Sequence, residues 1–185
     1  MASSPLGTLM ASLSKTLITG TFRPMRGHPD IHREFTGERI HVAAVCYRLK
    51  NGEPEFLLVR TRSGRWTFPK GGVDDDATHA AAAAREAYEE AGVQGQIEPE
   101  PFHWYFHSKR LRVRSQRSVI PVQAHLCEVE RLVTPKEDHR EPTWFTAEKA
   151  RRRLREKRTP ELAQEVVEVV ERALLRIHAR TRRAA

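Results

Sequence analysis

The chain has 185 residues, enough for one well-cored domain but too few for two typical domains and a linker, and its 39% hydrophobic and 30% charged residues are typical of a soluble globular protein. Lys and Arg outnumber Asp and Glu by 32 to 24, so the net charge of +8 favours an anionic partner: nucleic acid, an anionic membrane surface or a small polyphosphate. No apolar run approaches the roughly 18 residues that a membrane span requires, which excludes a membrane-spanning helix.

The first 38 residues carry little structural information. Residues 1–20 are rich in Ser, Thr and Leu, lack acidic residues, and have Lys15 as their only basic residue. This composition weakly resembles an organellar transit segment, but no Arg occurs before Arg23. We therefore predict a flexible N-terminal extension over residues 1–38, one domain over residues 39–180 and a basic tail over residues 181–185.

Two strands are predicted where the domain begins. Residues 40–49 are apolar and β-prone, and the Asn51-Gly52 pair that follows is typical of a hairpin turn. Residues 55–60 predict the returning strand. Residues 66–69 predict a short extended piece, because the residue before a proline disfavours helix.

A helix is predicted from Ala77 onward. Residues 80–84 are all Ala, the residue with the highest helix propensity. The carboxylates of residues 74–76 are expected to cap its N-terminus, and Gly92 to end it.

The second half of the chain adds strands and then helices. Strands are predicted over residues 102–107 and 119–129, and Trp144-Phe145 ends the loop that follows. Thr146 is expected to cap a short helix, and Pro160 to begin a final helix that runs to about Ala179 with an apolar face. That face suits either the sheet or a dimer contact, so the oligomeric state stays open. The order of elements predicts a mixed α/β domain with helices packed on a sheet.

The cysteine pattern concerns the compartment. Cys46 and Cys127 lie inside apolar stretches without the Cys-x-x-Cys or Cys/His spacing of a metal site. Buried, reduced thiols are predicted, which fits a reducing compartment and a cytoplasmic location.

The most informative stretch is a cluster of carboxylates on the first predicted helix. Glu86, Glu89 and Glu90 are spaced i, i+3 and i+4, so they share one helix face, where like charges repel by about 0.2–0.5 kcal/mol per adjacent pair. A hard divalent cation such as Mg²⁺ or Mn²⁺ would relieve this repulsion. Arg85 can reach Glu89 one turn on and is expected to hold it. Glutamate-rich helix faces are usually only solvated, so the residues around the cluster decide the interpretation.

These surrounding residues resemble a known family. The chain is similar to the Nudix box, Gly-x5-Glu-x7-Arg-Glu-U-x-Glu-Glu-x-Gly-U with U small or aliphatic, at Gly71, Arg85-Glu86-Ala87, Glu89-Glu90, Gly92 and Val93. The resemblance implies a Nudix-type α/β/α sandwich with a mixed sheet between helices. It departs at Ala77, where the box has its first glutamate. This gap either weakens catalysis or marks a non-catalytic relative, and the acidic residues 74–76 lie close enough to substitute in part.

The resemblance also implies a mechanism. It identifies the chain as a metal-dependent pyrophosphohydrolase that cleaves a phosphoanhydride bond in a polyphosphorylated small molecule, with Mg²⁺ or Mn²⁺ as cofactor. Arg85 would orient a carboxylate, and Glu89 would take part in catalysis. Members of the family often recruit a general base from a loop outside the box, for which Glu137 or Asp138 is the candidate. The metal ligands carried over are Glu86, Glu89, Glu90 and the carbonyl near Gly71.

Basic residues suggest the substrate class. Alternate residues of an extended chain point the same way, so Arg110, Arg112 and Arg114 are predicted to form one cationic ridge. Arg60 and Lys70 add positive charge beside the glycine turn and are expected to bind phosphate.

Within the family, the Phe-Pro-Lys-Gly-Gly turn, the basic segment and the Trp-Phe pair are most similar to the diadenosine and diphosphoinositol polyphosphate hydrolases. Nucleoside triphosphates and capped or triphosphorylated RNA ends stay open. RNA is not favoured, because no aromatic residues alternate with the basic ones. The alternative class is a non-catalytic polyphosphate or RNA sensor on the same fold, which Ala77 and the basic charge motivate.

Overall fold

The computed structural model of the chain describes residues 40–110 and 117–184. The predicted N-terminal extension lies outside the described residues. The elements in chain order are β1 His41–Lys50, β2 Glu53–Arg60, β3 Trp66–Thr67, β4 Lys70–Gly72, α1 His79–Ala91, β5 Val93–Ile97, β6 His103–Arg110, β7 Arg117–Leu132, the 3₁₀ turn η1 Asp138–Arg140, β8 Thr143–Thr146, α2 Ala147–Arg155 and α3 Pro160–Ala184.

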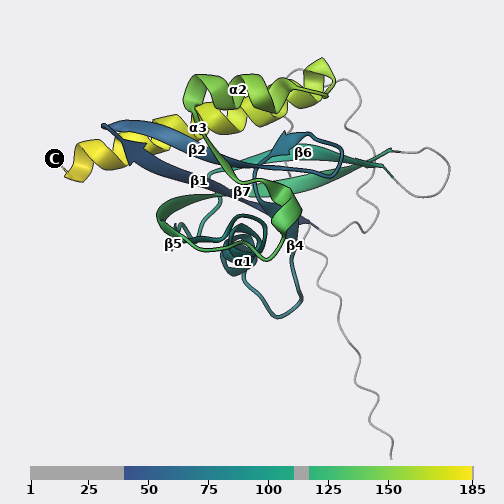
Figure 1. The fold of residues 1–185 in the computed structure, drawn as a ribbon, viewed down its shortest axis with the longest axis horizontal. Coiled ribbons are helices and arrows are strands. Elements are labelled where there is room, and N and C mark those ends of the chain that lie inside the picture. Colours follow the sequence, from purple (N-terminus) through teal and green to yellow (C-terminus); the bar gives the residue numbers. More distant parts are fainter. Residues whose placement is uncertain (1–39, 111–116, 185) are drawn as a thin grey trace, which may run out of the picture. The chain divides into compact units, whose positions relative to one another are not determined.

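The strands form one mixed sheet between layers of helices (Figure 1). β1 pairs with β7 in parallel, while β2, β4, β5, β6 and β8 all join through antiparallel pairs. The predicted hairpin between the first two strands is confirmed, with Asn51 and Gly52 at φ of 52° and 83° in the left-handed region that such a turn uses. The predicted mixed α/β sandwich is therefore the observed fold.

Alternation along β1 divides the core in two. Ala43, Val45 and Tyr47 face α2 and α3, whereas Val42, Ala44 and Cys46 face α1. In Figure 1 the two helical layers lie on opposite sides of the sheet. Both cysteines are buried and free, as predicted from their apolar surroundings. Because α1 packs through small Ala residues, its backbone lies close to the sheet, and so does its row of carboxylates.

The start of α1 differs from the prediction. Thr78 caps the helix, and its side chain accepts a hydrogen bond from the amide of Ala81 at 3.2 Å. Residues 74–76 therefore do not cap it and lie in the preceding loop. Gly92 ends α1 at φ 65°, as the sequence predicts, because the left-handed conformation there favours glycine.

The later elements also differ in part. Thr146 caps α2 as predicted, but Trp144 and Phe145 lie in β8, which pairs with β2, and not in a loop. The final helix begins at Pro160 as predicted and continues to Ala184, past the expected end at about Ala179. None of the helices in the described part of the chain is both long and apolar enough to cross a membrane.

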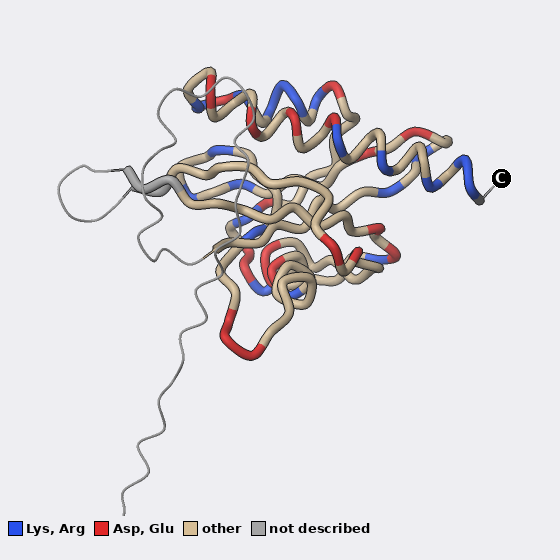
Figure 2. The backbone as a smooth tube through the Cα atoms, turned by 180° about the vertical axis from the view of Figure 1, so that it is seen from behind, with Lys and Arg blue, Asp and Glu red and all other residues tan. Residues whose placement is uncertain are grey.

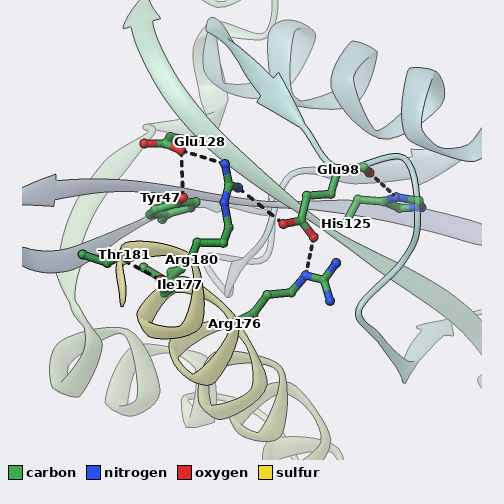
Figure 3. A network of polar contacts seen from close by, with 8 residues as sticks. All are labelled: Tyr47, Glu98, His125, Glu128, Arg176, Ile177, Arg180 and Thr181. Carbon is green, nitrogen blue, oxygen red and sulfur yellow. Dashed lines mark hydrogen bonds and ion pairs between the residues drawn. The ribbon is translucent and has the colours of Figure 1, made fainter. Parts of the chain in front are cut away.

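A polar network fastens the C-terminal half of α3 to the sheet (Figure 3). Arg176 and Arg180 both donate to Glu98, which follows β5, and Arg180 also donates to Glu128 on β7 at 3.2 Å. The hydroxyl of Tyr47 on β1 donates to the same Glu128 at 3.0 Å. Packing on the sheet therefore accounts for the apolar face of α3, with Val169, Val170, Ala173 and Ile177 all buried.

Candidate active site

The acidic positions of α1 and of the loop before it lie together on one side of the sheet (Figure 2). Glu90 is only 2% exposed, whereas Glu86 and Glu89 are partly buried. A carboxylate as buried as Glu90 needs hydrogen-bond or charge partners. The surroundings of these glutamates therefore show how the chain keeps three acids on one helix face.

Gly71 on β4 is in direct contact with Glu86. A Cβ atom at Gly71 would overlap the carboxylate of Glu86, whereas one at Gly72 would meet nothing within 4 Å. The absent side chain at Gly71 thus leaves the space that the Glu86 carboxylate occupies. Burial raises the pKa of Glu86; Arg85 opposes this shift, while Glu89 and Glu137 add to it.

Glu90 is held from two sides. One carboxylate oxygen accepts the backbone amide of Lys70 at 3.2 Å, and the other is paired with the guanidinium of Arg140. Burial raises the pKa of Glu90 to about 7, although Arg140 and Lys70 both favour the ionised form. In the opposite sense, burial lowers the pKa of Lys70 to about 8 while Glu90 opposes the shift.

The segment after β7 returns to α1 and brings Glu137 with it. The amide of Glu137 donates to the carbonyl of Glu89 at 3.0 Å, and the ammonium of Lys136 lies 3.0 Å from the Glu89 carboxylate. The side chain of Glu137 pairs with Arg140 at 2.6 Å. A residue far from the helix in the sequence thus lies beside its carboxylates.

The contacts of Arg85 differ from the prediction. Its guanidinium lies 2.5 Å from the carboxylate of Asp74, and the ion pair of Glu89 is with Lys136. The expected hold of Arg85 on Glu89 is therefore not what the structure shows. Asp74 lies in the loop that also holds Ala77, and its carbonyl accepts the amide of Ala77 at 3.1 Å.

A cavity lined partly by basic side chains reaches η1 through His139. It has a volume of about 470 Å³ and is lined by Arg60, Thr61, Arg62, Gly64, His139 and Glu141. Arg60 pairs with Glu141 at 2.7 Å and lies over the ring of Trp66, 5.5 Å from its centroid. His139 belongs to η1, and its imidazole lies 3.7 Å from the carboxylate of Glu137. The cavity and the carboxylate cluster therefore share η1 as a wall.

Comparison with known proteins identifies the family to which this arrangement belongs. The sequence pattern of the NUDIX domain matches residues 39–167, which include every element from β1 to α2. The chain belongs to the Nudix hydrolase family. The motif identified in the sequence lies within the matched residues.

Two Nudix relatives and one solved structure show how far the likeness extends. The mitochondrial Nudix hydrolase 18 of Arabidopsis thaliana is 32% identical over 123 residues, which make up 62% of this chain and 68% of that protein. Diphosphoinositol polyphosphate phosphohydrolase 2 of Rattus norvegicus is 41% identical over 63 residues, 33% of this chain and 35% of that protein. A C. elegans Ap4A hydrolase superposes with a TM-score of 0.56 at 21% identity, covering 77% of this chain and 99% of that structure. At that identity, the superposition shows a shared fold.

Nudix hydrolases generally use divalent metal ions, and the donors at this site fit such an ion in their chemistry. Carboxylate oxygens are ligands that hard cations prefer, and Gly71 leaves room for the Glu86 carboxylate beside the backbone of β4. Among the described residues, no three His, Cys, Asp or Glu side chains converge as a preformed metal cage. The residues therefore fit a metal ion by the type of their donor atoms and not by a preformed geometry. The two carboxylate oxygens of Glu90 contact the amide of Lys70 and the guanidinium of Arg140.

The structure describes only part of the predicted cationic ridge of Arg110, Arg112 and Arg114. Of Arg110 the structure describes the backbone, at the end of β6 opposite Arg117, while Arg112 and Arg114 lie outside the described residues. Sequence reasoning missed Arg140, Asp74 as a partner of Arg85, and His139. No Nudix-box spacing includes Arg140 or His139, and only their nearness to Glu137 in the sequence could have drawn attention to them.

Proposed function

We propose that the chain is a metal-dependent pyrophosphohydrolase that cleaves a phosphoanhydride bond in a diadenosine polyphosphate or a diphosphoinositol polyphosphate. One observation carries the proposal: Glu137, whose amide donates to Glu89 on α1, lies 3.7 Å from His139, and His139 lines a cavity of about 470 Å³ together with Arg60 and Arg62. Hydrolysis of a phosphoanhydride requires a cation to be held near the reacting phosphorus and positive charge to hold the remaining phosphates. The carboxylates and the basic side chains of the cavity would supply these requirements.

The carboxylates would hold the cation, with Mg²⁺ or Mn²⁺ the ions proposed. Glu86, Glu89 and Glu90 would contribute oxygen ligands together with the carbonyl near Gly71. When bound, the cation supplies positive charge to the leaving phosphate and lowers the pKa of water. Arg85, anchored by Asp74, would favour the ionised form of Glu86, whose pKa burial otherwise raises.

Glu137 is the proposed general base. It lies beside the α1 carboxylates on a separate segment, so it can face the attacking water while the helix glutamates hold the cation. Its carboxylate would accept the proton of that water as the oxygen attacks phosphorus. Asp138, the other sequence candidate, is fully exposed at the surface of η1, which makes it the weaker choice.

The substrate would extend from the carboxylates into the cavity lined partly by basic side chains. Arg60, Arg62 and His139 present nitrogen donors along its wall, and guanidinium groups bind phosphate oxygens in a fork. Lys70, next to Glu90, would contact the phosphate nearest the reaction. The match over 63 residues to a diphosphoinositol polyphosphate phosphohydrolase supports this substrate class, as does the basic charge of the chain.

A substrate panel tests the proposal. Phosphate and nucleotide release is measured with Mg²⁺ and with Mn²⁺ for diadenosine tetraphosphate and hexaphosphate, diphosphoinositol pentakisphosphate, nucleoside triphosphates and triphosphorylated RNA. We expect turnover to be fastest with a member of the first two classes and to fall when Arg60 is changed to Ala. Binding without turnover of any member would overturn the proposal and favour the sensor alternative.

A further inference from the structure

Arg140 is a partly buried cation among the acids of the proposed site, and no motif includes it. Its side chain is 18% exposed, and it contacts two carboxylates that belong to different segments. One guanidinium nitrogen pairs with Glu90 on α1, and another lies 2.6 Å from the carboxylate of Glu137, just before η1. A planar guanidinium can bridge two acids in this way, whereas an ammonium is a single point charge.

The segment that carries Arg140 is docked on the last turn of α1. The amide of Val133 donates to the carbonyl of Gly92 at 2.8 Å, and the amide of Glu137 donates to that of Glu89 at 3.0 Å. These backbone contacts place the segment but leave the Glu137 side chain to be oriented. Among the described contacts, its orientation comes from Arg140 at 2.6 Å and from His139 at 3.7 Å.

Glu90 gives Arg140 a fixed point. It is 2% exposed, and the amide of Lys70 on β4 holds the carboxylate oxygen that Arg140 does not. The Arg140 guanidinium is therefore anchored to the helix and, through Glu90, to the sheet. Glu137, at 38% exposure, is the freer of its two partners, so fixing Arg140 also fixes Glu137.

Charge explains why such an anchor is needed. Glu137 and Glu90 pair with the same guanidinium, so their negative charges lie close together, and the amide of Glu137 donates to the carbonyl of Glu89 on the same helix. Without a cation between them, Glu137 would be repelled from the face it must approach. We propose that Arg140 is a positioning residue that binds Glu90 and Glu137 together and thereby holds Glu137 against the carboxylate face of α1. The proposal rests on the proposed function, in which Glu137 is the general base.

The first test measures turnover. Arg140→Gln is expected to lower kcat by about 100-fold, the cost of misplacing a catalytic group by about 1 Å, and to change KM by less than about threefold. Arg140→Lys is expected to recover little of the loss, because one ammonium cannot bridge both acids. Recovery of the full rate by Lys, or an effect confined to KM, would overturn the proposal and make Arg140 a charge or substrate contact.

A double-mutant cycle separates action through Glu137 from any other route. In a Glu137→Gln background, Arg140→Gln should lower kcat further by less than about threefold, because the group it positions is already gone. A further loss of about 100-fold in that background would overturn the proposal.

A readout independent of activity uses amide hydrogen exchange in the full chain. Residues 134–141 should exchange about tenfold faster in Arg140→Gln than in the unmodified protein. The matched control is Arg153→Gln, which breaks an i,i+3 ion pair between α2 and its C-cap residue Glu156 and should leave this segment unchanged. Unchanged exchange in Arg140→Gln would contradict the bridge, whereas failure of the unmodified chain to hydrolyse any substrate would refute only the proposed function.

Discussion

Gly71→Ala is expected to impair activity while leaving the fold and its stability nearly unchanged. A Cβ atom at Gly71 would lie well inside 3.0 Å of the Glu86 carboxylate, a separation that real Cβ contacts essentially never show. The atom it would displace is the far end of a flexible side chain and not backbone. The Gly71 backbone is also outside the left-handed region, so Ala can adopt it. We therefore expect the Glu86 carboxylate to move and strand β4 to keep its position.

The expected magnitudes differ for stability and activity. Replacing Gly by Ala at a compatible position raises the free energy of unfolding by about 0.4–1 kcal/mol, because it lowers the conformational entropy of the unfolded chain. This gain offsets part of the cost of moving Glu86. We therefore expect Tm to change by no more than about 4 °C. Moving a ligand or catalytic group by about 1 Å costs about 100-fold, so kcat should fall by that factor, or about 2.7 kcal/mol.

Gly72→Ala is the matched control, because a Cβ there would meet nothing within 4 Å. Steady-state turnover of the best panel substrate and thermal unfolding would be measured for the unmodified chain and both variants. We expect Gly72→Ala to behave like the unmodified chain and Gly71→Ala to lose rate while keeping its Tm. If the two variants had kcat values within threefold of each other, the packing of Glu86 on Gly71 would have no catalytic role.

Three further predictions concern charge. Burial lowers the pKa of Lys70 to about 8, so its positive charge is present below that pH and lost above it. KM for a polyphosphate should therefore rise as the pH increases through about 8, and Lys70→Met should abolish this pH dependence. Folding raises the pKa of Glu90 from its ordinary 4.5 to about 7, so the folded state binds the Glu90 proton more tightly than the unfolded state does. This contribution to the free energy of unfolding is fully present below pH 4.5 and is lost as the pH rises through about 7. Urea unfolding in EDTA should therefore show the free energy of unfolding falling over this range, and falling less in Glu90→Gln. Asp74→Asn should lower kcat/KM by less than about tenfold, since the Asp74–Arg85 ion pair is largely exposed. Adding Ala77→Glu to this variant should restore kcat/KM if a glutamate at position 77 can pair with Arg85 in place of Asp74.

Local patterns account for what the sequence predicts well. The alanine run, the capping Thr146 and Gly92 act within a few residues, so α1 and the start of α2 follow from composition and spacing. The Nudix box is also local, because it occupies one turn and one helix. The N-cap of α1 is Thr78 and not an acid of residues 74–76, because several residues there suit the role and only the backbone path decides between them.

Contacts between distant segments account for what the sequence does not reveal. Trp144 and Phe145 form a strand because β2 lies beside them, and four residues after a proline carry too little alternation to predict it. Arg140 lies fifty positions after Glu90 in the chain, and only the return of the β7–β8 segment to α1 brings them together. The general base candidate Glu137 emerged from family resemblance, whereas the residue that orients it required the fold.

Glu89→Gln probes the proposed role of the α1 carboxylates in metal-dependent cleavage of a phosphoanhydride bond. Product release from the best panel substrate would be measured against Mg²⁺ and Mn²⁺ concentration for the unmodified chain and for this variant, with Gly72→Ala as the reference for an innocuous change. We expect turnover that requires metal, stops in EDTA and falls by several orders of magnitude in Glu89→Gln. Metal-independent turnover, or a Glu89→Gln variant as fast as the unmodified chain, would contradict this role.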